Sequence, residues 1–350
     1  MELQTALKEI QPLNIEMMEM SRKRWDSIAK PLHSLGKMEE IVTQIVGITG
    51  DIHADISKKG LVAMCADNGV VEEGVTQTGQ EVTAIVAENF LEGSTSVCAM
   101  CRTAGVDVVP VDIGMIIDTK VRTDKKIAYG TKNIAKEPAM TREQAIRAIE
   151  AGMEIVEELK EKGYQILATG EMGIGNTTSS SAVASVLLNQ PVEMMTGRGA
   201  GLSSSGLERK INAIKKAIEL NQPNAEDPIE VLAKVGGFDI AGLVGVYLGG
   251  AVFHVPVVMD GFISCVAALV AMKICPLAGE YMIASHVSKE PAAHMILNAM
   301  NKEAVLHANM CLGEGTGAVT LFPFIEMGLS VYRSMSTFDD IKVEQYEELV

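Results

Sequence analysis

The sequence predicts an α/β protein with a Rossmann-like, doubly wound and mostly parallel sheet, and a small helical domain built from both termini. Three observations support this fold class. The chain has 350 residues, of which 47% are hydrophobic but only 4% aromatic, which suits aliphatic layers in one large domain beside a smaller one. Short apolar runs recur along the chain, and amphipathic helical patterns separate them.

The apolar runs are nearly free of charge and end in glycine or polar residues. Such runs are typical of strands buried on both faces of a parallel sheet. A longer uncharged stretch, residues 240–259, has the length of a membrane span, but Gly249, Gly250 and Pro256 divide it. It predicts a buried helix followed by a buried strand. The five expected strands are residues 61–66, 106–111, 164–169, 253–259 and 281–284.

The clearest helix begins after Thr141, because Thr141 and Gln144 have the spacing of a capping box. Apolar residues follow at helical spacing, and Gly163 ends the pattern before the next strand. Charged helical patterns also occupy both ends of the chain. We therefore expect a large catalytic domain at residues 46–324 and a small helical domain made of residues 1–45 and 325–350.

Composition narrows the class of protein. The formal charge is −15, and no run of Lys and Arg forms the basic stripe that a nucleic-acid binder needs. The N-terminus has no apolar signal core, and the six cysteines are dispersed, so we expect free thiols, a cytoplasmic protein and no membrane partner. Cys98 and Cys101 could form a metal or redox site, but two small residues on one helical face are the better interpretation. The histidines form no ligand pattern, so no metal or cofactor is expected.

Polar residues follow the expected strands, and ligands of open α/β sheets bind at the carboxyl ends of strands. One site lined by most of these loops is the economical interpretation. The polar strand ends are residues 67–69, 112–114, 170–173, 260–261 and 285–286.

Two glycine-rich segments could bind a phosphate. Residues 170–181 join an expected strand to a helix whose N-terminus offers free N–H groups, and an ordinary helix cap explains the segment about as well. Residues 197–205 precede another helix, and Arg198 or Lys210 could neutralise a phosphate there. The alternative is the start of a solvated helix.

A third glycine-rich segment, residues 312–319, holds Glu314 between Gly313 and Gly315. Apolar neighbours could raise the pKa of Glu314 and make it a general base, whereas the alternative is a surface turn. The polar loop at residues 66–83 is long enough to form a pocket wall, or it is a plain capped connection.

The order and wording of these segments resemble the bacterial family of nicotinate-nucleotide:dimethylbenzimidazole phosphoribosyltransferases. The resemblance runs from residue 30 to about residue 335. The matching segments are residues 30–36, 65–70, 80–83, 170–173, 176–178, 221–224, 234–239, 260–262, 285–286 and 312–317.

The resemblance implies a homodimer that transfers phosphoribose from nicotinate mononucleotide to an aromatic base such as 5,6-dimethylbenzimidazole. The products would be nicotinate and an α-ribotide, the lower ligand of cobamides such as cobalamin. The resemblance implies that Glu314 is the general base and Glu171 a second catalytic carboxylate. It implies that the substrate-binding positions are Gly173, Asn176, Thr177, Lys210, Thr78, Val86, Gly313 and Gly315.

The acceptor pocket departs from the family pattern in two places. Thr78 and Gly79 stand where the family commonly has Ser or an aromatic residue followed by Pro, and Val86 stands where some members carry Gln. One alternative is therefore an enzyme for phenol or p-cresol, acting as one chain of a heterodimer with a similar chain. A non-catalytic nucleotide-binding paralogue is a further alternative. A Rossmann dehydrogenase is disfavoured because the G-x-G-x-x-G motif with its downstream acidic residue is missing.

Overall fold

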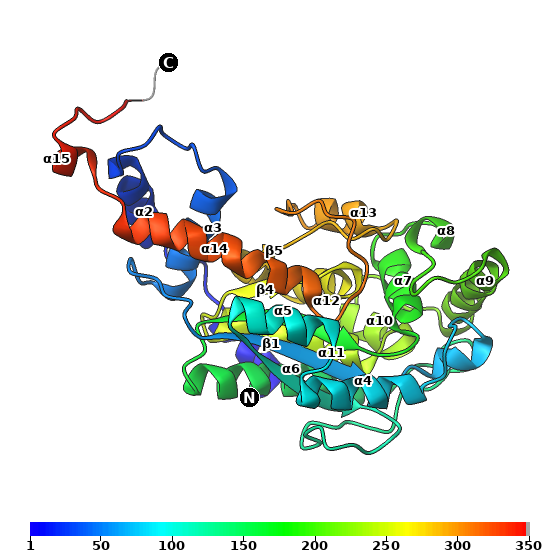
Figure 1. Cartoon of the computed structure of the whole chain (residues 1–350). Coiled ribbons are helices and arrows are strands. Elements are labelled where there is room, and N and C mark those ends of the chain that lie inside the picture. Colours follow the sequence, from blue (N-terminus) through cyan, green and yellow to red (C-terminus); the bar gives the residue numbers. More distant parts are fainter. Residues whose placement is uncertain (348–350) are drawn as a thin grey trace.

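The computed structural model describes residues 1–347 and confirms the predicted α/β class (Figure 1). A single sheet of five strands has the order β2-β1-β3-β4-β5, and every pair in it is parallel. The strands are β1 (Lys59–Ala66), β2 (Val106–Gly114), β3 (Ile166–Met172), β4 (Val257–Met259) and β5 (Met282–Ala284).

All five expected strands are present, but β4 is shorter than predicted. The run at 253–256 does not join the sheet as a strand, because Phe253 caps the preceding helix and Pro256 lacks an N–H. Only the carbonyl of Pro256 reaches the sheet, where it accepts from Leu167 N at 3.0 Å. The strand order changes direction between β1 and β3, so the crevice at their carboxyl ends is the expected ligand site.

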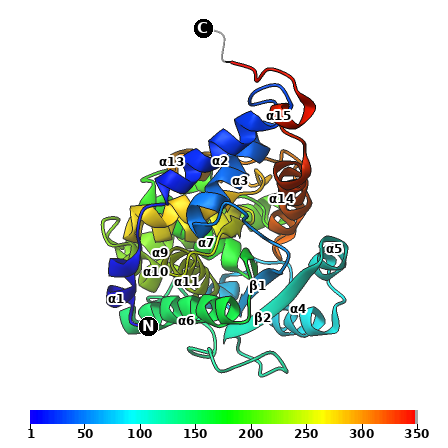
Figure 2. The same cartoon turned by 90° about the vertical axis from the view of Figure 1, so that its left-hand side faces the viewer.

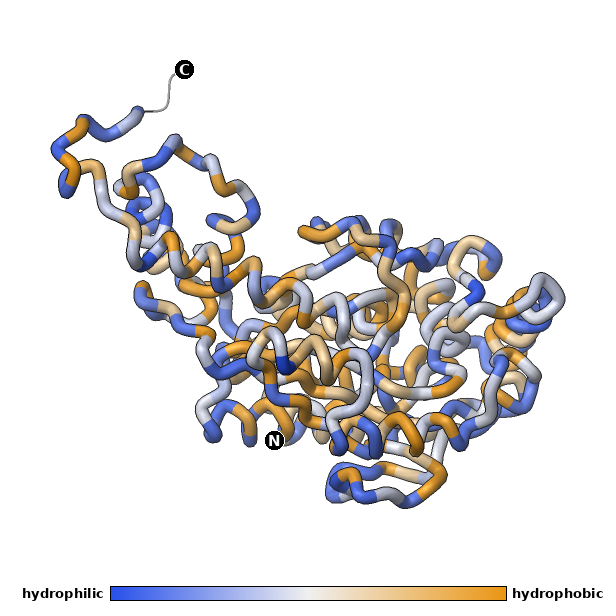
Figure 3. Tube along the Cα trace, in the orientation of Figure 1, coloured by the Kyte–Doolittle hydropathy of each residue, from blue (hydrophilic) through white to orange (hydrophobic). Residues whose placement is uncertain are grey.

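Two hydrophobic layers cover the sheet because successive residues of a strand point to opposite faces. Val62 and Met64 belong to the layer that includes helices α6 (Arg142–Glu161), α11 (Phe238–Val252) and α12 (Phe262–Ile274). Leu61 and Ala63 belong to the other layer, with α3 (Lys37–Thr49), α5 (Ser96–Ala104) and α14 (Thr316–Ser334). Figure 3 shows most hydrophilic residues on the outer helices and loops.

The capping box of α6 is formed as predicted: Thr141 Oγ1 accepts from Gln144 N at 3.2 Å, and Thr141 N donates to Gln144 Oε1 at 2.9 Å. Residues 240–259 form the buried helix α11 and then β4, which confirms that interpretation. Glycines bring α6 and α11 into backbone contact, since a Cβ on Gly152 would lie 2.8 Å from Gly245 Cα. No helix within residues 1–347 has the length and apolarity to cross a membrane.

Cys98 and Cys101 are buried free thiols on one side of α5, as the helical interpretation predicts.

The remaining helices also connect the strands or pack around the sheet. They are η1 (Gly69–Glu73), α4 (Glu81–Glu92), α7 (Asn176–Leu187), α8 (Val192–Met195), α9 (Ser204–Asn221), α10 (Pro228–Val235), η2 (Pro276–Tyr281) and α13 (Ala293–Ala299).

Helices from both termini meet at one end of the molecule (Figures 1 and 2). There α2 (Ile15–Ser27) and α3 lie beside the C-terminal half of α14, and the rings of Trp25 and Tyr332 are 4.9 Å apart. The first helix, α1 (Leu3–Glu9), instead packs on α6 and α11, and α15 (Phe338–Ile341) lies beyond α14. The division into a large domain at 46–324 and a small domain at 1–45 and 325–350 stays a prediction, and residues 348–350 lie outside the described part.

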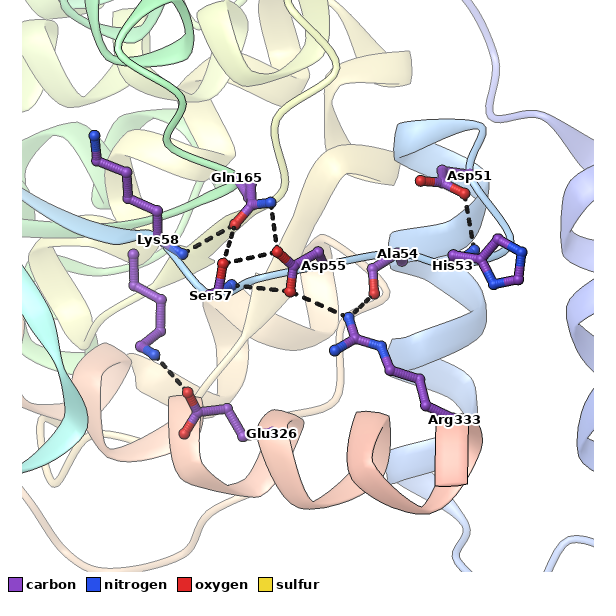
Figure 4. A network of polar contacts seen from close by, with 10 residues as sticks. Asp51, His53, Ala54, Asp55, Ser57, Lys58, Gln165, Glu326 and Arg333 are labelled. Carbon is purple, nitrogen blue, oxygen red and sulfur yellow. Dashed lines mark hydrogen bonds and ion pairs between the residues drawn. The ribbon is translucent and has the colours of Figure 1, made fainter. Parts of the chain in front are cut away.

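A polar network lies at the amino ends of β1 and β3 (Figure 4). Asp55 accepts hydrogen bonds from Ser57 Oγ and Gln165 Nε2, both at 2.7 Å, and pairs with Arg333 of α14 at 3.3 Å. Nearby, buried Lys59 forms an ion pair with Glu326 of the same helix. Burial raises the pKa of Asp55, but its hydrogen bonds outweigh that effect, so the pKa falls below its usual value. This edge of the sheet is therefore held by matched charges.

Candidate active site

A cavity of about 350 Å³ opens at the carboxyl ends of the strands, a size that suits a small ligand. The loops after β1, β3, β4 and β5 all contribute to its wall, as predicted. The loop after β2 does not, because Asp112 there accepts from the N–H groups of Gly114 and Met115 and pairs with Lys126 at 2.9 Å. The wall is made of residues 75–78, 171–177, 198–200, 202, 260–264, 286, 288, 290 and 311–314.

The glycine-rich turn after β3 brings the start of α7 to this cavity. Gly175 has a φ of +95°, which side chains rarely tolerate, and a Cβ on Gly173 would lie 2.5 Å from both Ala66 O and Asp239 Oδ2. The turn therefore needs glycine at both positions. Asn176, the first residue of α7, points its amide at two carboxylates: Nδ2 donates to Asp239 Oδ2 at 2.9 Å and to the carboxylate of Glu171.

Glu171 and Asp239 are buried acids held together by that one amide. Burial, followed by the charge of Asp239, raises the pKa of Glu171 to about 8. Burial likewise raises the pKa of Asp239 to about 6, against the hydrogen bond from Asn176. Within the described residues neither carboxylate has a salt-bridge partner. A cationic ligand group in the cavity would supply the missing charge.

Glu314 lies in a turn that glycine makes accessible. Its φ is +61°, between +89° at Gly313 and +90° at Gly315. Its Oε2 atom accepts from Val97 N at 3.1 Å, in the first turn of α5, so the helix N-terminus stabilises its charge. Burial nevertheless raises its pKa overall. Glu314 is thus a half-buried carboxylate with a raised pKa in the cavity wall, which is what a general base requires.

Glu171 lies directly against this turn. A Cβ on Gly313 would come within 2.6 Å of Glu171 Oε1, and the backbone N–H of Glu314 donates to the Glu171 carboxylate. The structure therefore brings the two acids selected from the sequence to one point, although they are far apart along the chain.

Asp260 is a further buried carboxylate of the cavity wall. It receives backbone N–H bonds from Gly315 at 3.1 Å, Gly317 at 2.8 Å and Ala318 at 3.2 Å, and so fixes the N-terminus of α14 behind Glu314. Burial raises its pKa, while the neighbouring His286 lowers it. Asp260 and His286 were expected only as polar strand ends. The structure adds that Asp260 orients the loop of the candidate base.

Lys210 of α9 is not a wall residue of the cavity, but it contacts Thr177, which is one. Its ammonium donates to Thr177 Oγ1 at 2.8 Å and to Gly197 O at 3.2 Å, and the residue is only 1% exposed. The alternative of a solvated lysine is therefore wrong. Burial lowers its pKa to about 8, against the charge of Glu290. Arg198 lies in the cavity wall, where its guanidinium donates to Leu202 O at 2.7 Å.

The remaining sequence-predicted residues divide between the cavity and its support. Thr78 and Gly313 line the cavity. Gly315 contributes through its bond to Asp260. Val86 lies on α4, half-buried against the layer that contains α5, and is absent from the wall. Glu290 and Asp239 were missed as site residues. Asp239 begins α11 and does not end a strand, so strand-end reasoning could not find it.

Comparison with known proteins matches this arrangement to one family. A family model described as "Phosphoribosyltransferase" matches residues 10–343. The nicotinate-nucleotide–dimethylbenzimidazole phosphoribosyltransferase of Ruminiclostridium cellulolyticum is 51% identical, with 100% of each chain covered. The protein of that name from Acetivibrio thermocellus is 49% identical, with 99% of each chain covered.

A solved structure agrees along the backbone. The nicotinate-nucleotide–dimethylbenzimidazole phosphoribosyltransferase of Thermus thermophilus superposes with a TM-score of 0.88 at 34% identity, covering 95% of this chain and 100% of that one. Sequence and fold therefore agree along almost the whole length, and the chain belongs to the nicotinate-nucleotide–dimethylbenzimidazole phosphoribosyltransferase family.

Proposed function

We propose that this enzyme transfers phosphoribose from nicotinate mononucleotide to 5,6-dimethylbenzimidazole, giving α-ribazole 5′-phosphate and nicotinate for cobalamin and related cobamides. The observation that carries the proposal is the placement of Glu314. Its carboxylate lies in the cavity wall, on a glycine-flanked turn, beside the buried acid Glu171. The family and its relatives support the choice of substrates.

The 5′-phosphate would bind at the N-terminus of α7, where the wall residue Thr177 is backed by the buried cation Lys210. Thr177 is in the first turn of α7, and its hydroxyl oxygen accepts a hydrogen bond from the ammonium of Lys210. N–H groups at such a terminus, together with an ammonium, suit a phosphate. Gly197 and Gly199 form the adjoining turn.

The reaction follows from the charges at the other side of the cavity. The C1′ atom of the ribose gains positive charge as nicotinate leaves, and the carboxylates of Glu171 and Asp260 would stabilise that charge. Nicotinate departs from a pyridinium that is already cationic, so its departure needs neither a general acid nor a metal. Attack by the acceptor nitrogen on the opposite face inverts the β configuration to α. Glu314 accepts the N–H proton that the benzimidazole loses.

The acceptor ring would pack on apolar side chains near Glu314. Thr78 is a polar residue of the same wall. We assign dimethylbenzimidazole over a phenol because the phenolic alternative rested on Val86, which is away from the cavity. The proposal includes a homodimer in the cytoplasm. The apolar wall residues are Val75, Met172, Ile174 and Leu312.

The test is direct. Purified enzyme with nicotinate mononucleotide and dimethylbenzimidazole should yield nicotinate and a product with the mass of α-ribazole 5′-phosphate, also in the presence of EDTA. Phenol and adenine serve as competing acceptors. If nicotinate is released with none of these bases, or if only phenol is ribosylated, the proposed acceptor is wrong.

A further inference from the structure

Glu290 is an acid in the cavity wall whose burial raises its pKa. It belongs to the loop after β5, and its carboxylate reaches across the cavity wall to the turn at Gly197 and Gly199. Glu290 Oε2 lies so close to Gly197 that a Cβ there would collide with it, and the nearby backbone N–H of Gly199 lowers the pKa of the carboxylate. The backbone N–H of Glu290 is itself held by Ser288 Oγ at 3.3 Å.

The groups around that carboxylate are those of an anion site. Lys210 is the cation that faces it, and a Cβ on Gly199 would lie 3.5 Å from Lys210 Nζ and 2.9 Å from Thr177 Oγ1. The ammonium makes its own hydrogen bonds to neutral oxygens, one of Thr177 and one of Gly197. Within the described residues Lys210 and Glu290 form no ion pair, but, against the larger effect of burial on each, the charge of Glu290 raises the pKa of Lys210 and the charge of Lys210 lowers the pKa of Glu290. Glu290 is therefore an acid that partly balances the charge of this buried cation.

We propose that Glu290 is a resident anion: its carboxylate occupies the turn at Gly197 and Gly199, and the 5′-phosphate of the nucleotide must displace it. This inference rests on the proposed function only in placing the phosphate beside Lys210 and Thr177. It adds an internal competitor for that phosphate, supplied by the chain itself.

Electrostatics favour the exchange. A phosphate monoester carries a charge of about −1.5 to −2 at pH 7, and one lysine cannot neutralise both it and a carboxylate. The N–H of Gly199 likewise cannot serve both anions fully. Burial also raises the pKa of Glu290, which shows that the carboxylate is held at some cost in charge solvation. Glu290 therefore has to withdraw or take up a proton when phosphate arrives.

The consequence is a lower affinity for every phosphate-bearing ligand by one common factor. A site that is open only a fraction of the time binds more weakly by that fraction. The nucleotide compensates through contacts of its ribose and pyridinium with the rest of the cavity. Inorganic phosphate has no such contacts, so Glu290 keeps it from occupying the empty site. Glu290 therefore favours binding of the whole nucleotide over binding of inorganic phosphate.

Calorimetric titrations with sodium phosphate and with nicotinate mononucleotide test the idea on the full chain. Glu290→Gln removes the charge, and Glu290→Ala removes the side chain. Glu226→Gln is the matched control, since it removes one acid from an exposed position. Both Glu290 variants should bind phosphate and nucleotide more tightly by the same factor, on the order of tenfold, which corresponds to a site open about a tenth of the time. The KM for nucleotide should fall without a rise in kcat.

Other outcomes separate this inference from the function on which it rests. Unchanged affinities in the Glu290 variants, with nucleotide binding that still depends on Lys210, would overturn the resident anion and leave the function standing. Weaker nucleotide binding with unchanged phosphate binding would overturn it as well, because Glu290 would then be a direct ligand of the nucleotide. A protein that binds neither ligand in any variant would sink both the inference and the phosphate site.

Discussion

The two ends of the sheet differ in whether their charged side chains are paired. At the amino ends, Asp55 is matched with Arg333, Lys59 is matched with Glu326, and the pKa of Asp55 falls below its usual value (Figure 4). At the carboxyl ends, Glu171, Asp239, Asp260 and Glu314 are buried or half-buried, and their pKa values are all raised.

The difference teaches where to look for chemistry in this fold. A matched ion pair near the surface has already received its partner and contributes only to holding α14 on the sheet. Unmatched buried acids raise the free energy of the empty site and leave the charge balance to the ligand. The acids at the carboxyl ends therefore suit a positively charged reacting centre, whereas the ion pairs at the amino ends stabilise the fold.

Among changes at the two ends of the sheet, replacement of the proposed base Glu314 is expected to have the largest effect, and that effect is on turnover. Glu314→Gln keeps the shape of the side chain but cannot accept a proton, so turnover should fall by about 10² to 10⁴-fold. Thermal unfolding should be nearly unchanged, because the amide oxygen can still accept from Val97 N. Steady-state kinetics with dimethylbenzimidazole measures the loss. Near-normal turnover in this variant would contradict the role of Glu314.

The second test concerns the buried cation at the same edge. Lys210→Ala removes the ammonium that we propose lies beside the phosphate, and hydrogen bonds to charged groups contribute about 1.5–3 kcal/mol. Nicotinate mononucleotide should bind about ten- to a hundredfold more weakly by calorimetry, while dimethylbenzimidazole binding stays within about twofold. Equal weakening of both ligands would indicate general damage to the fold. Lys215→Ala, on the same helix but exposed, is the control.

The pH dependence should report on two titratable groups at the carboxyl ends of the strands. Glu171, whose pKa is about 8, gains its negative charge as the pH rises, whereas Lys210, also near 8, loses its positive charge over the same range. If both charged forms are needed, kcat/KM for the nucleotide should be bell-shaped with a maximum near pH 8 and fall about tenfold per pH unit on either side.

Bound substrate should widen that profile. The phosphate raises the pKa of Lys210, and the cationic reacting centre lowers that of Glu171, so kcat should vary less with pH than kcat/KM does. Measurements of both constants from about pH 6 to 10 decide the matter. A flat kcat/KM profile across this range would show that these two groups do not control binding.

The amino-end network should respond in stability alone. Asp55→Asn removes a partly exposed charge, and surface pairs of this kind contribute about 0.2–1 kcal/mol after solvent screening. Because the pKa of Asp55 is lowered in the folded protein, its contribution is present above the usual pKa of an Asp and is lost as the pH falls through the folded value. Urea unfolding at about pH 7 and pH 3 should show the difference at the higher pH only, with kcat unchanged.

The smallest effect is expected at Val86. The residue packs on the hydrophobic layer beside α5 and does not line the cavity. Val86→Gln should therefore leave the ratio of phenol to dimethylbenzimidazole products unchanged in a competition assay, with at most a small loss of stability from burying an amide. A changed product ratio would restore the acceptor-selecting role that the family resemblance implies.

Much of this arrangement was predictable from the sequence because parallel strands place their carboxyl ends together. The apolar runs located the five strands, and the polar residues after them included Glu171, Asp260 and His286. The loop at 112–114 was included wrongly, since nothing local distinguishes a polar strand end that binds a lysine from one that faces a cavity. The position of Val86 was likewise beyond the pattern, because helix α4 has apolar residues on more than one face.

Other site features depend on contacts between distant segments. Asp239 begins a helix, and only the folded chain shows its carboxylate on the amide of Asn176, 63 residues away. Glu290 meets the turn at Gly197 only after β5 is in place. Lys210 was recognisable as a basic residue near a glycine-rich turn, but its burial was not, because the helical pattern of α9 does not distinguish a solvated face from one that closes a cavity.

The bond between Glu314 and the first turn of α5 makes this helix a reporter of the charge on Glu314. The N–H of Val97 donates to Glu314 Oε2, which belongs to the carboxylate that we propose as the general base. When Glu314 is protonated, that N–H loses an anionic partner and keeps a weaker, neutral one. The amide resonance of Val97 therefore moves with each proton that the base accepts, and one backbone signal follows the protonation state of Glu314 without any label in the cavity.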